Sequence, residues 1–346
     1  MNNKTKIKAL IHSGAYITNV GNAFVQNGAK FIIESALKDK CDTFFSTAEP
    51  NSFYLDRYIE PSQPSYWQDG LQRLCRRLGI QVQNNHIVKQ PEGAVPEGRV
   101  FDVMANAQYD LLVVPGMTIC GEYIRVCGPS VLQAVKNGAK VLFLGAGGEF
   151  YSENEKAQFL NFLDKVQPIG IRTRDEGTYE MLKKWSPEIT LGMDCAFYAN
   201  DFFTPTRLSI DSYVASNFDM GKEPDFIHSF ANVVRTYHRA VGPTHENVFR
   251  DRLNVMISDV PSDYLIVYAN AKEVHSDRVH ACVVSLAYGT PVRFYYKTPR
   301  SGLFGPVGAE AVARELTVLD RDHFQKIKNE QVEWTRRVIE SHFNME

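Results

Sequence analysis

The sequence predicts an α/β fold of two domains, each built on a parallel β-sheet covered by helices. The chain has 346 residues, more than one ordinary hydrophobic core organises. Two runs, DLLVVPG at 110–116 and KVLFLGAGG at 140–148, are apolar almost throughout, which is typical of strands buried on both faces. Segments with the helical spacing of apolar residues alternate with such runs, and this alternation favours parallel sheets.

Composition narrows the class of protein. Hydrophobic content of 44% and charged content of 23% are typical of a soluble globular protein. The formal net charge of −2 argues against a nucleic-acid partner. No run approaches the roughly 20 apolar residues of a membrane helix, and the N-terminal stretch predicts a first strand rather than a signal peptide. The 6 cysteines show neither CxxC nor zinc spacing, so we expect free thiols, a cytoplasmic location and no metal.

The first predicted unit is a strand, a loop and a helix. Residues 7–11 form the strand, and residues 24–36 keep helical spacing. Because ligands of open α/β sheets bind where such loops meet helix N-termini, Asn19, Gly21 and Asn22 are candidate binding residues. The loop lacks GxGxxG, so the dinucleotide fingerprint is absent.

Two further strand ends, PGMT and GAGG, follow the two apolar runs. The ends of neighbouring parallel strands meet at one edge of a sheet, so we expect Gly116, Thr118 and Gly147 to shape a pocket there. The glycines indicate either phosphate contact or tight packing.

Between the first unit and these strands lie a weak strand at 43–46, an aromatic and proline-rich segment at 49–64 and a helix at 66–78. Phe53, Tyr54 and Tyr58 indicate either a rim that stacks on sugars or ordinary loop packing.

We place the first domain at residues 1–167, because Pro168 ends the helix predicted at 152–166. The second domain, 168–308, then begins with a strand, Arg174, Asp175 and a helix. This Arg–Asp pair indicates a surface ion pair or a bidentate anion clamp. The other expected elements are strands at 191–197 and 212–216, a helix at 225–238, ambiguous segments at 248–258 and 264–270, and helices at 309–316 and 324–343. We expect the second of these helices to pack back on the first domain.

The stretch 274–303 has the clearest chemical pattern. Ser276 and Asp277 precede Arg278 and His280, which open a helix that ends before Gly289. A strand at 292–296 and two basic residues, 297 and 300, follow. A helix N-terminus, an arginine and a histidine at one point describe an anion site beside an acid or base. Strand–helix–strand units are general, however, and an Arg-x-His also occurs by chance.

Four segments together resemble the polysaccharide pyruvyl transferases, in the family's order. They are NVGNAFVQNGA, IGIRTRDEGTYEML, LGMDCAF and SDRVHACVVSLAYGTP. The chain departs from the family pattern at Asn22, where an acidic residue is common, and in VVPGMT, where the family has three glycines. The resemblance implies two Rossmann-like domains in a GT-B-like arrangement.

The resemblance also implies a reaction: transfer of the enolpyruvyl part of phosphoenolpyruvate onto a sugar as a cyclic ketal, with no metal or cofactor. The partners would be this donor, on the side of domain 168–308, and a sugar acceptor on the side of domain 1–167. The acceptor-side loops are those with Asn19, Gly21, Asn22, Gly116, Thr118 and Gly147. A membrane-linked acceptor would bring the protein to a membrane surface. His280 is expected as general acid/base and Arg278 beside it. The donor's two anionic groups would meet Arg174, Asp175, Ser276, Lys297 and Arg300. A nucleotide-sugar glycosyltransferase of the same architecture and a non-catalytic glycan-binding relative stay open, as does the oligomeric state.

Overall fold

The structure is a computed structural model that describes residues 6–14, 19–47, 101–116, 120–148, 153–186, 188–238 and 253–343. Residues 1–48 and 103–346 form one compact unit, which contains both sheets described here. The predicted aromatic segment 49–64, the helix 66–78 and Thr118 lie outside the described residues.

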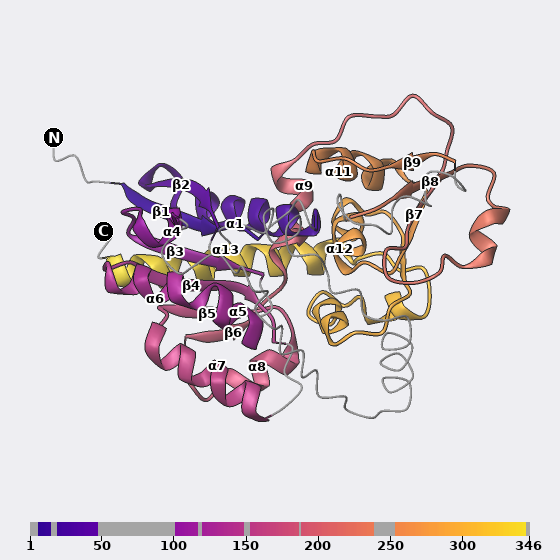
Figure 1. The fold of residues 1–346 in the computed structure, drawn as a ribbon. Helices are drawn as coiled ribbons and strands as arrows, with labels where there is room; N and C mark the ends of the chain where they lie inside the picture. Colours follow the sequence, from indigo (N-terminus) through magenta and orange to yellow (C-terminus); the bar gives the residue numbers. More distant parts are fainter. Residues whose placement is uncertain are drawn as a thin grey trace. The chain divides into compact units, whose positions relative to one another are not determined.

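Within the described residues, one sheet has six parallel strands in the order β2-β1-β3-β4-β5-β6 (Figure 1). The strands are β1 Ile7–His12, β2 Cys41–Ser46, β3 Leu111–Pro115, β4 Lys140–Ala146, β5 Gly170–Thr173 and β6 Ile189–Leu191. The two apolar runs are β3 and β4, and both are buried nearly throughout, as predicted. Their continuous apolar pattern follows from cover on both faces of the sheet.

The strands β5 and β6 extend this first sheet and do not begin the second one, contrary to the boundary expected at residue 168. Ile171 pairs with Phe143 of β4 and with Ile189 of β6. Gly170 packs so closely on Trp334 that an added Cβ would lie 3.1 Å from the indole ring. A later helix therefore covers one face of β5, and the chain leaves the first sheet only after Leu191.

The strand expected at 191–197 is shorter than predicted. It ends at Leu191, and a 3-10 turn, η2 (Cys195–Tyr198), follows. Asp194 begins this turn, because its Oδ1 accepts a hydrogen bond from the backbone N of Ala196 at 2.8 Å. A side-chain cap of this kind competes with strand pairing and ends it.

Within the described residues, a second parallel sheet has five strands in the order β11-β10-β7-β8-β9. They are β7 Val214–Asn217, β8 Val233–Thr236, β9 Val255–Met256, β10 Glu273–Ser276 and β11 Val292–Phe294. The helix expected at 225–238 is wrong: a 3-10 turn, η3 (Asp225–Ser229), precedes β8. The β-branched sequence VVRT favours a strand, and a buried ion pair between Arg235 and Glu223 holds it.

Helices and 3-10 turns cover both sheets. In chain order they are α1 Gly21–Leu37, η1 Lys38–Lys40, α4 Val103–Asn106, α5 Gly121–Val126, α6 Gly128–Lys136, α7 Glu153–Val166, α8 Glu176–Leu182, η2, α9 Ala199–Phe202, η3, α11 Pro261–Asn270, α12 Val279–Tyr288, η5 Pro299–Phe304, η6 Glu310–Ala313 and α13 Arg321–Phe343. The ambiguous segment 264–270 is α11. The helix expected at 309–316 is only the short η6, and Thr317 instead bridges to Val292 of β11.

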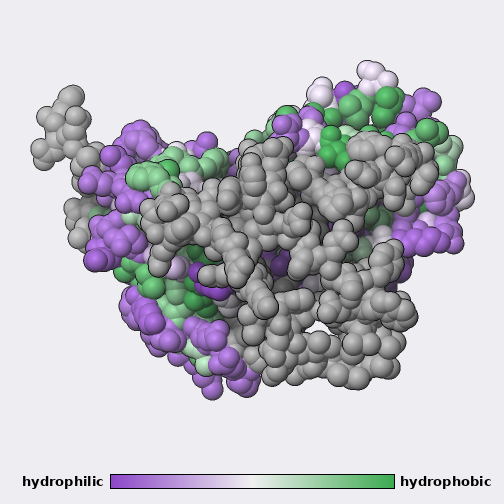
Figure 2. Space-filling view, viewed as in Figure 1, coloured by the Kyte–Doolittle hydropathy of each residue, from purple (hydrophilic) through white to green (hydrophobic). Residues whose placement is uncertain are grey.

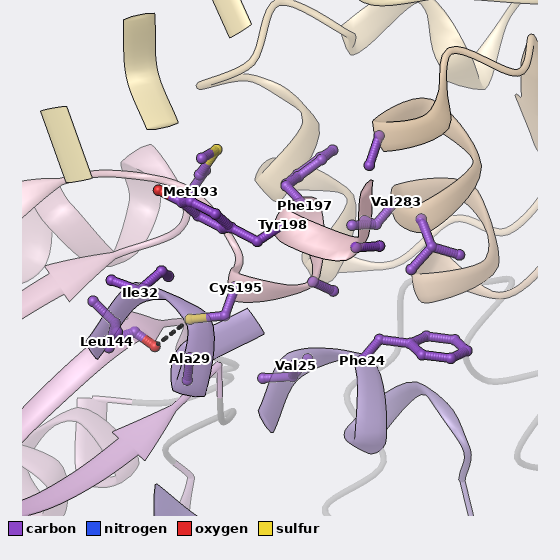
Figure 3. Close-up of a cluster of buried hydrophobic side chains, with 14 of the residues drawn as sticks. Phe24, Val25, Ala29, Ile32, Leu144, Met193, Cys195, Phe197, Tyr198 and Val283 are labelled. Atoms are coloured by element: carbon purple, nitrogen blue, oxygen red, sulfur yellow. Dashed lines mark hydrogen bonds between the residues drawn. The ribbon is translucent and has the colours of Figure 1, made fainter. Parts of the chain in front are cut away.

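The two faces of the first sheet belong to two hydrophobic clusters, and alternate residues of β3 divide between them. Val113 faces the cluster that contains α1, η2, α12 and α13, whereas Leu112 faces α5, α6 and α7. In Figure 3, Phe24 and Ile32 of α1 lie in the first cluster beside η2, with Val283 of α12 nearby. One continuous core therefore includes residues of both sheets' helices.

Helix α13 returns to the first sheet after the second sheet is complete, as predicted. It packs against α1, and Lys140 of β4 donates a hydrogen bond to the carbonyl of His342 (Figure 1). Gln331 of α13 is fully buried, and its Oε1 accepts from the backbone N of Met193 at 2.9 Å. The helix thus supports the segment that carries Asp194.

Exposed apolar side chains include Ile210 and Leu253. On the face shown in Figure 2, apolar surface lies in several separate places among hydrophilic residues. None of the helices in the described part of the chain has the length and apolar character needed to cross a bilayer.

Candidate active site

The site lies where the loops at two topological switch points touch. In the first sheet the chain runs from β1 to β2 on one side and later to β3 on the other; in the second sheet β7 and β10 are related in the same way. Ligands of open parallel sheets bind beyond the carboxyl ends of strands at such points. Asn19 follows β1 and Arg278 follows β10, and Arg278 Nη2 donates to Asn19 Oδ1 at 3.0 Å.

Arg278 is held at the start of α12 by both its backbone and its guanidinium. Ser276 Oγ accepts from the backbone N of Arg278 at 2.8 Å, and Arg278 Nε lies 3.2 Å from Asp219 Oδ2. Ser276 is fully buried and also donates to Asn217 Oδ1, so its hydroxyl positions the backbone around Arg278. The guanidinium is therefore preset before any ligand arrives.

Asp277 stabilises the loop opposite Arg278. Its carboxylate accepts hydrogen bonds from three successive backbone N–H groups, those of Asp219, Met220 and Gly221, at 3.0, 2.8 and 2.7 Å. This fixes the turn that carries Asp219, the acidic partner of Arg278. The side chain is buried, and burial raises the pKa of Asp277 although these three hydrogen bonds oppose that shift.

Two helix N-termini meet at this point. Helix α12 has no side-chain cap and no acidic residue in its first turn, and the same holds for α1. The backbone N–H of Gly21, at the start of α1, donates a hydrogen bond to Asn19 Oδ1 at 3.2 Å. Both helix dipoles direct their positive ends to the region around Arg278, which favours an anion there.

His280, in the first turn of α12, faces both switch points. Its Nε2 lies 3.7 Å from Asp194 Oδ2, longer than a hydrogen bond, and has no hydrogen-bond partner among the described residues. Its Nδ1 is beside Gly21, where an added Cβ would lie only 2.5 Å from that nitrogen. Burial lowers the pKa of His280; Asp194 opposes the shift, and Arg174 and Arg300 add to it. The ring is accordingly neutral at pH 7.

Asp194 is the residue that the sequence interpretation missed. It is fully buried, accepts from Ala196 N and forms an ion pair with Arg174, whose Nη1 lies 2.7 Å from Asp194 Oδ2. Burial by itself raises the pKa of a carboxyl group, but here the neighbouring His280, Arg174 and Ala196 N–H lower the pKa of Asp194 to about 2. The segment LGMDCAF contains this aspartate, but its apolar residues predict only a strand and do not indicate a partner for the carboxylate.

Arg174 is paired inside the protein rather than open to solvent. Besides Asp194, its Nη1 donates to the carbonyl of Gly116 at 2.6 Å. A Cβ on Gly147 would lie 2.5 Å from Arg174 Nε, and one on Gly116 would lie 2.3 Å from Val25. Of the two roles open for these glycines, the structure thus shows tight packing, around Arg174.

The other predicted site residues occupy different surroundings. Asp175 caps α8, because its Oδ1 accepts from Thr178 N at 2.7 Å. Lys297 and Arg300 are exposed on the segment after β11. Asn22 lies against Gly14, where a Cβ would meet its Nδ2 at 2.8 Å. Across the residues that the structure describes, no three His, Cys, Asp or Glu side chains are grouped as a metal site requires.

The model of the polysaccharide pyruvyl transferase family matches residues 19–296, which include the NVGN loop, Arg174, Asp194, Arg278 and His280. The chain belongs to this family of transferases. No curated protein sequence matches the chain. The loops at the two switch points and the start of α12 all lie within the matched residues 19–296.

Solved structures show that this transferase has a GT-B-like fold. A UDP-N-acetylglucosamine 2-epimerase covers 98% of this chain and 95% of its own at 14% identity, with a TM-score of 0.52. The Staphylococcus aureus protein MnaA with UDP covers 98% of this chain and 97% of its own at 10% identity, with a TM-score of 0.52. The Neisseria meningitidis UDP-GlcNAc 2-epimerase bound to UDP-GlcNAc covers 96% of this chain and 93% of its own at 10% identity, with a TM-score of 0.50. At these identities the similarity concerns the fold alone.

Proposed function

We propose that this transferase moves the enolpyruvyl group of phosphoenolpyruvate onto a sugar of a glycan or glycan precursor, as a ketal. One observation carries the proposal beyond family membership. His280, whose imidazole is neutral, lies beside Arg278 where two helix N-termini meet. A proton-transfer group next to a preset anion site is what an anionic enol donor requires.

Arg278 and the two helix ends bind the donor's phosphate and carboxylate. Arg174, which the sequence suggested as a second clamp, already has Asp194 as its counter-ion, so in this proposal it acts through Asp194. Arg300 and Lys297 are exposed and supply outer contacts to the phosphate. The charge of Arg300 also contributes to the lowered pKa of His280.

The reaction balances without a metal or redox group. One sugar hydroxyl oxygen bonds to C2 of the donor, and C3 gains a proton to become a methyl group. The C2–O bond to phosphate then breaks, inorganic phosphate leaves, and a second hydroxyl oxygen bonds to C2. The two hydroxyl groups lose one proton each; one proton is matched by the proton that C3 gains, and the other is taken up by the departing phosphate. Neutral His280 accepts each hydroxyl proton as a base and returns it as an acid.

The cysteines of the described residues form no disulfide. Free thiols fit a reducing compartment, and we therefore propose a cytoplasmic location, where a glycan precursor on a lipid or nucleotide carrier is within reach.

The test uses the purified full chain, phosphoenolpyruvate and a panel of free, lipid-linked and nucleotide-linked sugars, with released phosphate and product mass as readouts. His280→Ala should lower phosphate release at least 10²-fold, the usual contribution of general acid–base catalysis. Arg278→Lys should weaken donor binding, since lysine keeps the charge but loses the planar fork. His323→Ala, an exposed histidine on α13, is the control. Unchanged release by His280→Ala would remove His280 from the mechanism.

Ligand-induced stabilisation separates the donor classes. A helix N-terminus also suits a nucleoside diphosphate. A rise in melting temperature with phosphoenolpyruvate, and none with UDP, supports the proposal; the reverse pattern would favour a nucleotide-sugar enzyme on the same fold. Binding without turnover on every acceptor would favour a non-catalytic relative.

A further inference from the structure

We infer that Asp194 is a positioning residue that fixes the tautomer of His280, so that Nδ1 is the nitrogen that exchanges protons with substrate. The identity of that substrate rests on the proposed function, whereas the tautomer does not. The inference extends the site from the start of α12 to a buried carboxylate of the first sheet's last connection.

The two ring nitrogens of His280 face different surroundings. Nε2 is buried and its nearest acidic atom is Asp194 Oδ2, 3.7 Å away. A neutral imidazole carries one proton, and a bare lone pair on Nε2 would be repelled by this carboxylate, whereas an N–H is attracted to it. The proton therefore resides on Nε2, and Nδ1 keeps its lone pair. In unliganded sites such contacts are commonly long and shorten when substrate binds.

Asp194 is built to stay charged and in place. Arg174 and the N–H of Ala196 bind its two oxygens, at 2.7 and 2.8 Å, and Arg174 is itself anchored on the carbonyl of Gly116. Among the described residues, Arg300 of η5 and His238 after β8 also interact electrostatically with His280. Burial strongly lowers the pKa of His238, so it is neutral, and Asp194 remains the acidic group that faces His280.

Nδ1 faces the first residue of α1. Its neighbour is Gly21, at the switch point of the first sheet, and only a glycine leaves space there because a Cβ would lie 2.5 Å from the nitrogen. Arg278, the proposed anion-binding residue, contacts Asn19 in the same loop. The lone pair of Nδ1 is thus presented next to the anion site, and Asp194 stabilises the imidazolium that forms when Nδ1 accepts a hydroxyl proton.

The first experiment requires no turnover. In protein labelled with 15N-histidine, the ring of His280, identified by the signals lost in His280→Gln, should show a protonated Nε2 and a bare Nδ1 at pH 8. In Asp194→Asn the amide NH2 competes for Nε2, and the population should shift to the Nδ1-protonated form. A wild-type ring that is protonated on Nδ1 would overturn the inference, whatever the protein's substrate.

The second experiment measures function. With phosphoenolpyruvate and an accepted sugar, Asp194→Asn should lower kcat about 10³–10⁴-fold, as expected when the wrong tautomer is stabilised, and leave KM within about threefold, since Asp194 does not contact the donor. Glu223→Gln is the matched control, because Glu223 is also buried and paired with an arginine, Arg235, but does not face His280. Equal losses in both variants would indicate a structural effect and contradict the positioning role. If no donor is turned over but the tautomer is as expected, the proposed function fails and the positioning role stands.

Discussion

Replacement of Gly21 by alanine tests the tight contact between α1 and His280. Gly21 is the first residue of α1, and an added Cβ would lie 2.5 Å from His280 Nδ1 and 2.9 Å from His280 Cβ. Ordinary contacts between such atoms are about 3.5 Å. His280 or the start of α1 must therefore move by about 1 Å, and the methyl group would lie where Nδ1 meets substrate.

A displacement of about 1 Å at a reacting group commonly lowers the rate about 10²-fold. We expect at least that loss in kcat for Gly21→Ala. Overpacking costs about 1–3 kcal/mol, and alanine regains up to about 1 kcal/mol by restricting the unfolded chain. The variant should therefore unfold with a free energy lowered by about 1–2 kcal/mol and remain folded at 25 °C.

Steady-state phosphate release and thermal unfolding measure the two effects separately. Gly121→Ala is the matched control, since Gly121 also begins a helix and its Cβ would meet its nearest atom, Gln158 Oε1, at an ordinary 3.4 Å. In a His280→Ala background the Gly21→Ala change should cost less stability than in the wild type, because the contact with Nδ1 is gone and only the one with Cβ, at 2.9 Å, remains. A Gly21→Ala enzyme with wild-type kcat would refute the placement of His280 against α1.

We expect three further outcomes, which concern the buried groups of His280, Asp194 and Lys328. Because burial lowers the pKa of His280, the acid limb of the kcat/KM profile should lie below pH 6.5, activity being lost as pH falls and the ring becomes charged. The folded pKa of Asp194 is about 2 against an ordinary 3.8, so this carboxylate should stabilise the fold by about 2 kcal/mol above pH 5. That contribution should vanish as pH falls towards 2, and acid titrations of unfolding for wild type and Asp194→Asn should converge there. Lys328→Met should destabilise the protein by roughly 1–3 kcal/mol in denaturant unfolding, because Lys328 Nζ bonds Asn200 at 2.6 Å and pairs with Asp201.

The sequence was sufficient for the elements whose pattern is local. The apolar runs of β3 and β4, the helical spacing of α1 and the start of α12 at Arg278 all follow from neighbouring residues. The placement of β5 failed because it depends on Gly170 packing on Trp334, a contact between positions far apart in the chain. The segment at 225–238 failed because its apolar residues suit both a helix and the β-branched strand that pairs with β7.

Some residues of the site could also be predicted from the sequence and others could not. Arg278 and His280 were recognisable because helix N-terminus, cation and imidazole are adjacent in sequence. Asp194 was not, because a carboxylate becomes a partner of His280 only through folding, across 86 positions from residue 194 to residue 280. Arg174 was recognised as a cation, but its counter-ion, Asp194, is brought next to it only by folding.

Helix α13 has a consequence for how the protein is made. It covers β5 of the first sheet and, through Gln331, holds the backbone next to Asp194, yet it is synthesised after the whole second sheet. While the chain is still on the ribosome, the first sheet has one face without this cover and the loop of Asp194 without its support. We therefore expect the first sheet to become protease-resistant only after residues 321–343 have emerged, so that the surroundings of Asp194 are completed later than the second sheet.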